Sequence, residues 1–182
     1  DLDAVLGTAD GTLRYFENTP AGYVELLGTL NPFDGIDVGT NAVPAFANLD
    51  GDADLELVVG AGDGVVTTYD KNGLGDYVPA ALAPFNGTDF GDAAAPALVN
   101  LDGDADLELV VGAADGTVTT YDLVLGVYVP AAVNPFAGID VGANSVPTLI
   151  DLDNDGDLDA MIANAGGTVK FLENIGTLTA PL

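Results

Sequence analysis

Cysteine, histidine and tryptophan are absent from this chain of 182 residues. Without cysteine or histidine the chain forms no disulfide, no cysteine-protease or Ser-His catalytic centre, and no zinc site that uses those ligands. Its single serine is Ser145. The stability of the folded chain must therefore come from packing or from bound ions.

Basic residues are also scarce, with 3 Lys+Arg against 29 Asp+Glu and a formal net charge of -26. This excess argues against binding to nucleic acid or to an anionic membrane surface. Because 48% of the residues are hydrophobic, the chain differs from a disordered acidic tail. It has no apolar run of the length expected for a membrane span, and its N-terminal stretch lacks the basic-then-apolar pattern expected of an intact signal peptide. It begins at Asp1 without a Met, which suggests processing or an excerpt of a longer protein.

A long repeat organises the sequence. Asn48–Ala61 and Asn100–Ala113 are identical (NLDGDADLELVVGA), Asp151–Ala160 (DLDNDGDLDA) is a third copy, and Asp1–Ala4 matches the end of that copy. The chain therefore holds three and a half units of about 52 residues. It starts and stops in the middle of a unit, as expected for part of a longer array or for a protomer that a neighbour completes.

Each unit has the pattern of four short strands separated by turn residues, without a helical period. In the unit that begins near Ala42, the expected strands are Ala42–Ala47, Leu55–Gly60, Val65–Tyr69 and Tyr77–Leu82. The second strand is apolar at nearly every position, which predicts cover on both faces. The third strand alternates more and is expected to turn one face to water. Its equivalent polar positions are Arg14, Thr67, Thr119 and Lys170.

Tandem antiparallel units of this length pack face to face as blades around an axis. We therefore expect an all-β fold, a β-propeller or open propeller arc of four-stranded antiparallel blades. A flat β-solenoid is the alternative. The chain 1–182 is then a single repeat domain, with a partial blade 1–41, blades 42–93 and 94–145, and a partial blade 146–182.

Oxygen-bearing side chains occupy every second position just before the second strand of each unit. These windows are Asn48, Asp50, Asp52, Asp54 and Glu56; Asn100, Asp102, Asp104, Asp106 and Glu108; and Asp151, Asp153, Asp155, Asp157 and Asp159, with Asp1 and Asp3 as the remnant of a fourth. Carboxylates packed this closely repel each other, and a hard divalent cation removes that conflict. Calcium accepts many oxygens in flexible geometry, whereas magnesium requires a tight octahedron.

The spacing differs from that of an EF-hand, because the twelfth position is Val59 when counted from Asn48 and Ile162 when counted from Asp151. It fits a nine-residue loop in which the side chains at positions one, three, five and nine converge. Position seven would offer its main-chain carbonyl. We predict about three complete calcium sites and a partial site at the N-terminus; a solvated acidic turn without an ion is the alternative. The position-seven residues are Asp54, Asp106 and Asp157.

The repeated D-x-D-x-D-G-D-x-D pattern, followed by an apolar strand and an Asp-Gly hairpin, resembles the VCBS and FG-GAP families of extracellular propeller repeats. Their calcium loops also occur on the integrin-type propeller. The resemblance spans essentially the whole chain, including ENIGTLTAPL at Glu173–Leu182, which is similar to the connection between the third and fourth strands of VCBS blades. It implies calcium ligation by positions one, three, five and nine, and a secreted or surface location.

Two positions depart from the family pattern, which usually has Asp first and Gly sixth. The last loop alone conforms, with Asp151 and Gly156. Ala53 and Ala105 at the sixth position would cost about 1 kcal/mol each if that residue had to be left-handed. Asn at the first position removes one charge from each of these two loops. We therefore expect the third loop to bind calcium most tightly.

A second repeated element follows the fourth strand, as NPFDGIDVG (Asn31–Gly39), PFNGTDFG (Pro84–Gly91) and NPFAGIDVG (Asn134–Gly142). We expect its aromatic residues to fill the core between blades. Its aspartates either line one propeller mouth, where they would bind a cation or sugar hydroxyls, or cap a turn through their own backbone, which is the interpretation we favour. The residues concerned are Phe33, Phe85, Phe136, Asp37, Asp89 and Asp140.

The sequence offers little support for catalysis. Every carboxylate pair that could serve glycoside hydrolysis recurs in each unit, whereas a catalytic pair normally occurs once. We expect a non-enzymatic, extracellular, calcium-binding propeller repeat with a structural role, as a segment of a surface adhesin or an extracellular fibre. The alternatives are a lectin-like or integrin-like ligand-binding module, with a glycan or protein ligand, and an accessory domain of a carbohydrate-active enzyme.

The first and last units are incomplete, which predicts pairing with another chain segment. The first unit lacks its opening strand and the last stops as its fourth strand begins, so each would leave an unpaired sheet edge. We expect self-association by strand pairing, or the remainder of a longer chain, to cover these edges. Such a contact gives a closed ring or a filament, depending on its rotation.

Overall fold

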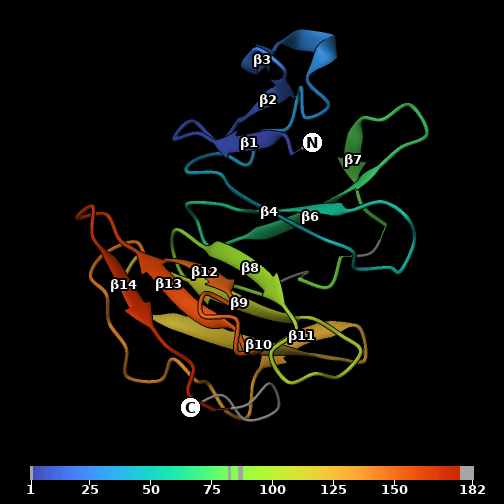
Figure 1. The fold of residues 1–182 in the computed structure, drawn as a ribbon. Helices are drawn as coiled ribbons and strands as arrows, with labels where there is room; N and C mark the ends of the chain where they lie inside the picture. Colours follow the sequence, from blue (N-terminus) through green and yellow to red (C-terminus); the bar gives the residue numbers. More distant parts are fainter. Residues whose placement is uncertain (1, 82, 86–87, 177–182) are drawn as a thin grey trace.

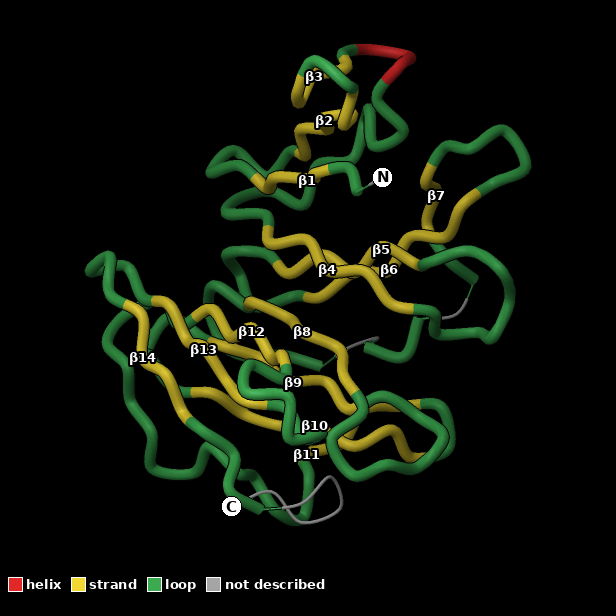
Figure 2. Tube along the Cα trace, viewed as in Figure 1, coloured by secondary structure: helices red, strands yellow, loops and turns green. Residues whose placement is uncertain are grey.

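The computed structural model describes residues 2–81, 83–85 and 88–176 of the chain. The described strands form four antiparallel sheets that follow one another along the chain (Figures 1 and 2). The first sheet contains β1 (Ala4–Gly7), β2 (Leu13–Thr19) and β3 (Gly22–Leu26), followed by the short 3-10 helix η1 (Gly28–Leu30). The second contains β4 (Val43–Ala47), β5 (Glu56–Gly60), β6 (Val66–Lys71) and β7 (Tyr77–Pro79).

The remaining two sheets repeat this order. The third contains β8 (Ala95–Val99), β9 (Glu108–Gly112), β10 (Val118–Val124) and β11 (Val127–Pro130). The fourth contains β12 (Val146–Ile150), β13 (Asp159–Ala163) and β14 (Val169–Leu172). The predicted all-β class and the four-stranded antiparallel unit are confirmed by the two central sheets. The expected end of a fourth strand at residue 82 and the expected fourth strand of the last unit, in 177–182, lie outside the described residues.

The second strand of each central sheet is covered on both faces, as predicted. All five residues of β5 and of β9 are buried. Alternate side chains of a strand point to opposite faces, and those of β5 enter two different clusters. Leu57 and Val59 pack with residues of the first sheet, such as Leu13, while Val58 packs with Leu109 of the third.

The third strands differ between the central and the outer sheets. Thr67 and Thr119 are half-buried, whereas Arg14 and Lys170 at the equivalent positions are exposed. The expectation that this position turns toward water therefore holds fully only in the first and last sheets. The physical reason is that each central sheet packs against a neighbour on both sides.

The repeated phenylalanines fill the spaces between consecutive sheets, which confirms their expected role. Phe33 is 4% exposed and stacks on Tyr77 of the next sheet, with ring centroids 4.9 Å apart. Phe85 stacks on Tyr128 in the same way, at 5.0 Å. Phe136 packs with Ile162 of the fourth sheet. The linker that follows each of the first three sheets therefore supplies an aromatic side chain that packs against the next sheet.

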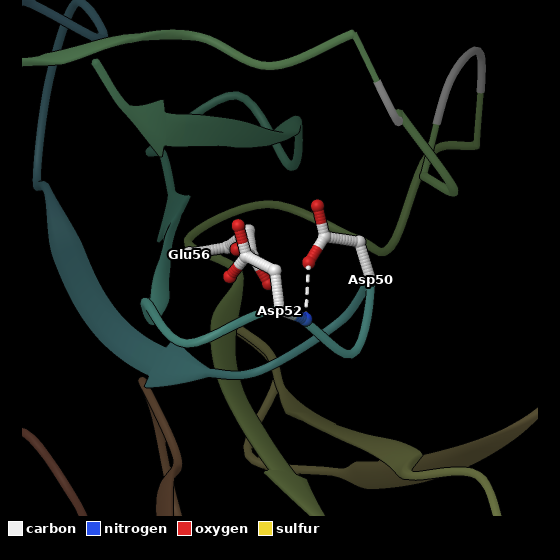
Figure 3. Close-up of side chains that lie close together, drawn as sticks. All are labelled: Asp50, Asp52 and Glu56. Atoms are coloured by element: carbon white, nitrogen blue, oxygen red, sulfur yellow. Dashed lines mark hydrogen bonds between the residues drawn. The ribbon is translucent and has the colours of Figure 1, made fainter. Parts of the chain in front are cut away.

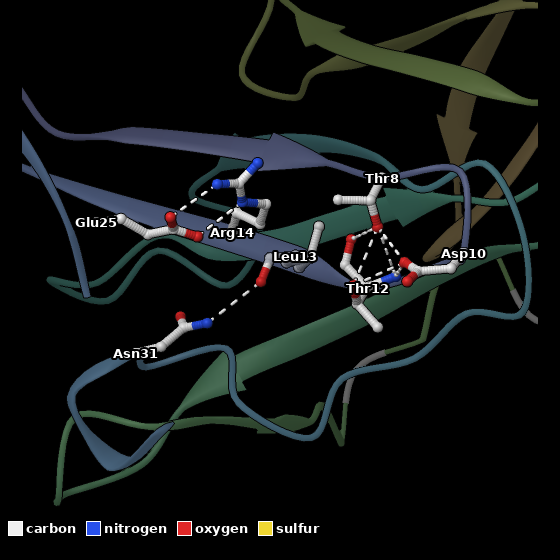
Figure 4. A network of polar contacts seen from close by, with 7 residues as sticks. All are labelled: Thr8, Asp10, Thr12, Leu13, Arg14, Glu25 and Asn31. Carbon is white, nitrogen blue, oxygen red and sulfur yellow. Dashed lines mark hydrogen bonds and ion pairs between the residues drawn. The ribbon is translucent and has the colours of Figure 1, made fainter. Parts of the chain in front are cut away.

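Hydrogen bonds from side chains fix the tight turns. In the Asp-Gly hairpin of the first sheet, the carboxylate of Asp10 accepts hydrogen bonds from the Thr8 and Thr12 hydroxyls (Figure 4). In the linkers, the main-chain N–H of the residue two positions on donates to the aspartate carboxylate, over 2.8–2.9 Å. The aspartates are Asp37, Asp89 and Asp140, so these side chains cap their own turns, as in the favoured interpretation.

Loss of the buried Tyr128 hydroxyl is expected to lower the free energy of unfolding more than loss of the exposed Tyr23 hydroxyl. The Tyr128 hydroxyl donates to the Leu107 carbonyl over 2.8 Å, and Tyr128 is 2% exposed. Replacing it in a Tyr128→Phe variant leaves that carbonyl without this donor, at a cost of about 1 kcal/mol in the free energy of unfolding. Chemical denaturation measures the cost. Tyr23→Phe is the control, because Tyr23 makes the matching bond to Leu2 but is 58% exposed; an equal loss in both variants would contradict the prediction.

Candidate metal centres

Three loops carry the predicted ligands, and each ends where a second strand begins. Position nine of each loop is the first residue of β5, β9 or β13, so the strand itself holds this carboxylate in place. Position four is left-handed in all three, at Gly51 (φ 82°), Gly103 (φ 79°) and Asn154 (φ 63°). Glycine and asparagine tolerate this conformation. The loops therefore curl back on themselves at the same point.

The sixth position behaves differently from the expectation. Gly156 of the third loop has a positive φ of 102°, but Ala53 and Ala105 are not among the residues with positive φ. The condition for the expected cost of alanine is therefore not met, because the first two loops place their left-handed residue only at position four. The stronger binding expected of the third loop now rests on the extra charge of Asp151 alone.

Side chains at the start of each loop bond to its backbone. In the first loop the Gly51 N–H donates to Asn48 Oδ1 over 2.7 Å, and the Asn48 amide nitrogen donates to the Asp52 carbonyl over 2.7 Å. The Asp52 N–H donates to Asp50 Oδ1 over 3.1 Å. The second loop repeats these bonds from Asn100. The asparagine at position one thus closes the loop, which explains why this position tolerates the loss of a charge.

Carboxylate oxygens converge in each of the three loops. Asp50, Asp52 and Glu56 each place one oxygen within 4.8 Å of the others, and Figure 3 shows the three side chains turned toward one another. Each of the other two loops also brings three carboxylate oxygens within 4.8 Å of one another. Their members are Asp102, Asp104 and Glu108 in the second loop, and Asp151, Asp153 and Asp155 in the third. Each cluster could hold a metal ion.

Position nine supplies a buried carboxylate in the first two clusters. Glu56 is 2% exposed and Glu108 is 5% exposed. Glu56 Oε2 accepts a hydrogen bond from the Leu49 N–H, but Glu56 Oε1 is buried without a hydrogen-bond partner in the described part of the chain. A buried carboxylate oxygen without a partner is costly. A cation bound between the three carboxylates would supply the missing partner.

The third loop uses a different set of positions. Asp159 is 1% exposed, but Asp159 Oδ1 accepts the Asn174 N–H over 2.9 Å and Oδ2 accepts the Leu152 N–H over 3.2 Å. Position one, Asp151, takes its place beside Asp153 and Asp155. The structure therefore joins positions three, five and nine in two loops, and positions one, three and five in the third.

The remaining predicted residues lie outside these clusters. At position seven, Asp54 is exposed and Asp106 half-buried, while Asp157 is buried and its Oδ1 has no hydrogen-bond partner among the described residues. Asp3 accepts hydrogen bonds from the Tyr15 hydroxyl and the Asn18 N–H, so it ties the first sheet together. Asp1 lies outside the described residues, and the partial N-terminal site stays a prediction.

The electrostatics of the loops favour an added positive charge. Burial raises the pKa of the Glu56 and Glu108 carboxyls. The hydrogen bond between Asp155 and Asp157 raises the pKa of Asp157 to about 6 and lowers that of Asp155. The ion pair formed in the described part of the chain, Arg14 with Glu25 at 2.7 Å, lies in the first sheet and neutralises none of the clusters (Figure 4). Oxygen-only clusters of this kind suit hard divalent cations.

Comparison with known proteins adds no assignment: no family model matches the chain, and no curated protein matches it either. Within the described residues, no helix has the length and the apolar character needed to cross a bilayer. The three carboxylate clusters are the feature from which a function can be argued.

Sequence reasoning missed one recurrent contact outside the loops. In each of the first three sheets, a tyrosine on the last strand (β3, β7 or β11) donates its hydroxyl to a main-chain carbonyl just before strand β1, β5 or β9 of the same sheet. The signal was present in the sequence, because Tyr-Val-Pro occurs at both Tyr77–Pro79 and Tyr128–Pro130. Its meaning depends on which carbonyl the fold places within reach.

Proposed function

We propose that the chain is a non-enzymatic, calcium-binding β-propeller repeat of an extracellular structural protein, a segment of a surface adhesin or fibre. The observation that carries this proposal is the triplet of carboxylate clusters with a buried glutamate in the first two. Side-chain and main-chain oxygens around one ion are the ligands that calcium prefers. The proposed role of the ion is to brace loops whose carboxylates otherwise repel each other.

The packing of the sheets supports the propeller arrangement. Consecutive sheets pack face to face through the aromatic residues of the linkers. Their first strands lie next to one another, with β4 against β8 and β8 against β12. In a propeller the first strand of each blade lines the central axis, which brings these strands together. We propose that the four sheets are blades or parts of blades of an open arc.

The extracellular location and the structural role rest on the chemistry of such sites. Calcium-binding modules outside the cell have dissociation constants near 10⁻⁴–10⁻³ M, and sites on exposed loops can reach this affinity. Positions three and five are exposed in all three loops. The recurrence of a carboxylate cluster in three units suits a mechanical role better than a catalytic one. A brace is useful in every unit, whereas catalysis needs only one site.

Calcium titration by isothermal calorimetry, after removal of metal with a chelator, tests this function. We expect three bound ions per chain, and two after Asp52→Asn, which removes one charge from the first cluster. Asp76→Asn is the control, because Asp76 is exposed and outside the clusters. Full stoichiometry in the Asp52 variant, or the absence of saturable calcium binding, would contradict the proposal.

A further inference from the structure

A tyrosine on the fourth strand of each central sheet contacts the acidic loop of the same sheet. The Tyr77 hydroxyl donates to the Leu55 carbonyl over 3.1 Å, and the Tyr128 hydroxyl donates to the Leu107 carbonyl over 2.8 Å. Leu55 and Leu107 are position eight of their loops. Each bonded carbonyl therefore belongs to the peptide group that joins position eight to the buried glutamate at position nine.

The Tyr77 side chain is itself held in place by the preceding linker. Its ring stacks on Phe33 with centroids 4.9 Å apart, and its N–H donates to the Pro32 carbonyl over 3.0 Å. Phe46, two residues before the first loop, packs edge-on against the same ring at 6.1 Å. Tyr77 therefore contacts the strand that enters the first loop as well as the carbonyl at the end of that loop.

Tyr128 repeats this arrangement in a more buried setting. It is 2% exposed, its ring stacks on Phe85 at 5.0 Å, and its N–H donates to the Pro84 carbonyl over 3.3 Å. Burial, together with carboxylates that include positions seven and nine of the adjoining loop, raises the pKa of both tyrosines. Both hydroxyls therefore stay protonated and remain hydrogen-bond donors.

The third loop is built without this support and serves as an internal reference. No tyrosine follows Tyr128 in the sequence. At position nine, both oxygens of Asp159 accept main-chain N–H groups, and Asp159 is outside the cluster of its loop. The third cluster therefore uses neither a position-nine carboxylate nor a tyrosine on a fourth strand.

We propose that Tyr77 and Tyr128 are positioning residues for the first and second metal centres, and that each holds its position-nine glutamate in place before an ion arrives. Carboxylates that lie this close together repel each other, so a metal-free loop tends to open. A hydrogen bond that orders the loop beforehand lowers the ordering cost that binding must otherwise meet. This inference rests on the proposed function, because the clusters are its metal centres, but the order of the metal-free loop can be measured separately.

Amide hydrogen exchange of the metal-free chain, measured by NMR in EGTA, tests the order of the loops. Residues 48–61 and 100–113 are identical in sequence, so each loop is the control for the other. Tyr128→Phe keeps the ring and should speed exchange in residues 100–108 about fivefold, as expected for one lost hydrogen bond, without changing residues 48–56. Tyr77→Phe should do the reverse, by about threefold, because Tyr77 is only half-buried. Unchanged exchange in the variant's own loop, or an equal rise in both loops, would overturn the proposal.

Calcium titration by calorimetry tests the consequence for binding. Asp52→Asn should abolish binding at the first cluster and Asp104→Asn at the second, so each background reports on the other central loop. Tyr128→Phe should lower the calcium affinity of the second cluster about fivefold in the Asp52→Asn background and leave the affinities unchanged in the Asp104→Asn background. An equal loss in both backgrounds, or a loss in neither, would overturn the positioning role. Absence of calcium binding to the wild-type chain would refute the proposed function, whereas the exchange rates decide by themselves whether the tyrosines order the loops.

Discussion

Calcium at about 1 mM is expected to raise the Tm of the metal-free protein by about 10 °C. If each cluster binds with a dissociation constant of about 10⁻⁴ M, tenfold below the free calcium concentration, it adds about 1.4 kcal/mol to the free energy of unfolding. Three clusters then add about 4 kcal/mol, and 1 kcal/mol corresponds to about 2–4 °C in a chain of this size. Differential scanning calorimetry measures the shift.

Magnesium is the control for this result. Calcium accepts the carboxylate oxygens of these loops in flexible geometry, whereas magnesium requires a tight octahedron and gives up its water shell reluctantly. We expect less than about a third of the calcium shift at the same magnesium concentration. EGTA should return the Tm to the value of the metal-free protein. A Tm that changes with neither calcium nor EGTA would contradict the prediction and show that packing alone stabilises the loops.

Gly112→Ala is expected to destabilise the fold by about 3 kcal/mol, because the added methyl group overfills a sheet-to-sheet contact. A Cβ at Gly112 would lie 2.1 Å from the Ser145 carbonyl oxygen and 2.7 Å from Ser145 Oγ. Ser145 is fully buried, and its Oγ accepts the Ala113 N–H over 2.8 Å. The neighbouring linker cannot move without breaking this bond. Urea denaturation should show the loss as a lower midpoint.

Two further substitutions test the same reasoning, one at the equivalent contact and one as a control. Gly60→Ala should cost a similar amount, because its Cβ would lie 2.1 Å from the Ala94 carbonyl oxygen at the equivalent contact. Gly73→Ala should be close to neutral, because no atom lies within 4 Å of its Cβ and its φ is not positive. Similar urea midpoints for the Gly112 and Gly73 variants would contradict the prediction, because they would show that the contact between sheets accommodates the added methyl group without cost.

Regular patterns in the sequence accounted for the secondary structure. Alternating strands and Asp-Gly turns predicted β5 and β6 to within two residues at each end. The apolar run from Leu57 to Val59 predicted a strand buried on both faces, and these residues are 0% exposed. Local rules suffice for such features, since turn residues and side-chain alternation act over a few positions.

The candidate metal centres were predictable only in part. The two-residue spacing identified the candidate positions. It could not predict that both oxygens of Asp159 accept hydrogen bonds from main-chain N–H groups. It also could not predict that one oxygen of Glu56 has no hydrogen-bond partner among the described residues. Nor could it tell that alanine at position six avoids a left-handed conformation. These outcomes depend on which backbone groups the neighbouring strand and loop bring within reach.

The sequence by itself determined the repeat, the all-β class, the positions of the acidic loops and the aromatic contacts between sheets, because each follows from short-range patterns repeated at a fixed interval. Only the tertiary structure decided which carboxylates meet and why Gly60 and Gly112 admit no side chain. Those properties arise where separate units touch, and the distance between units is set by packing across the whole stack.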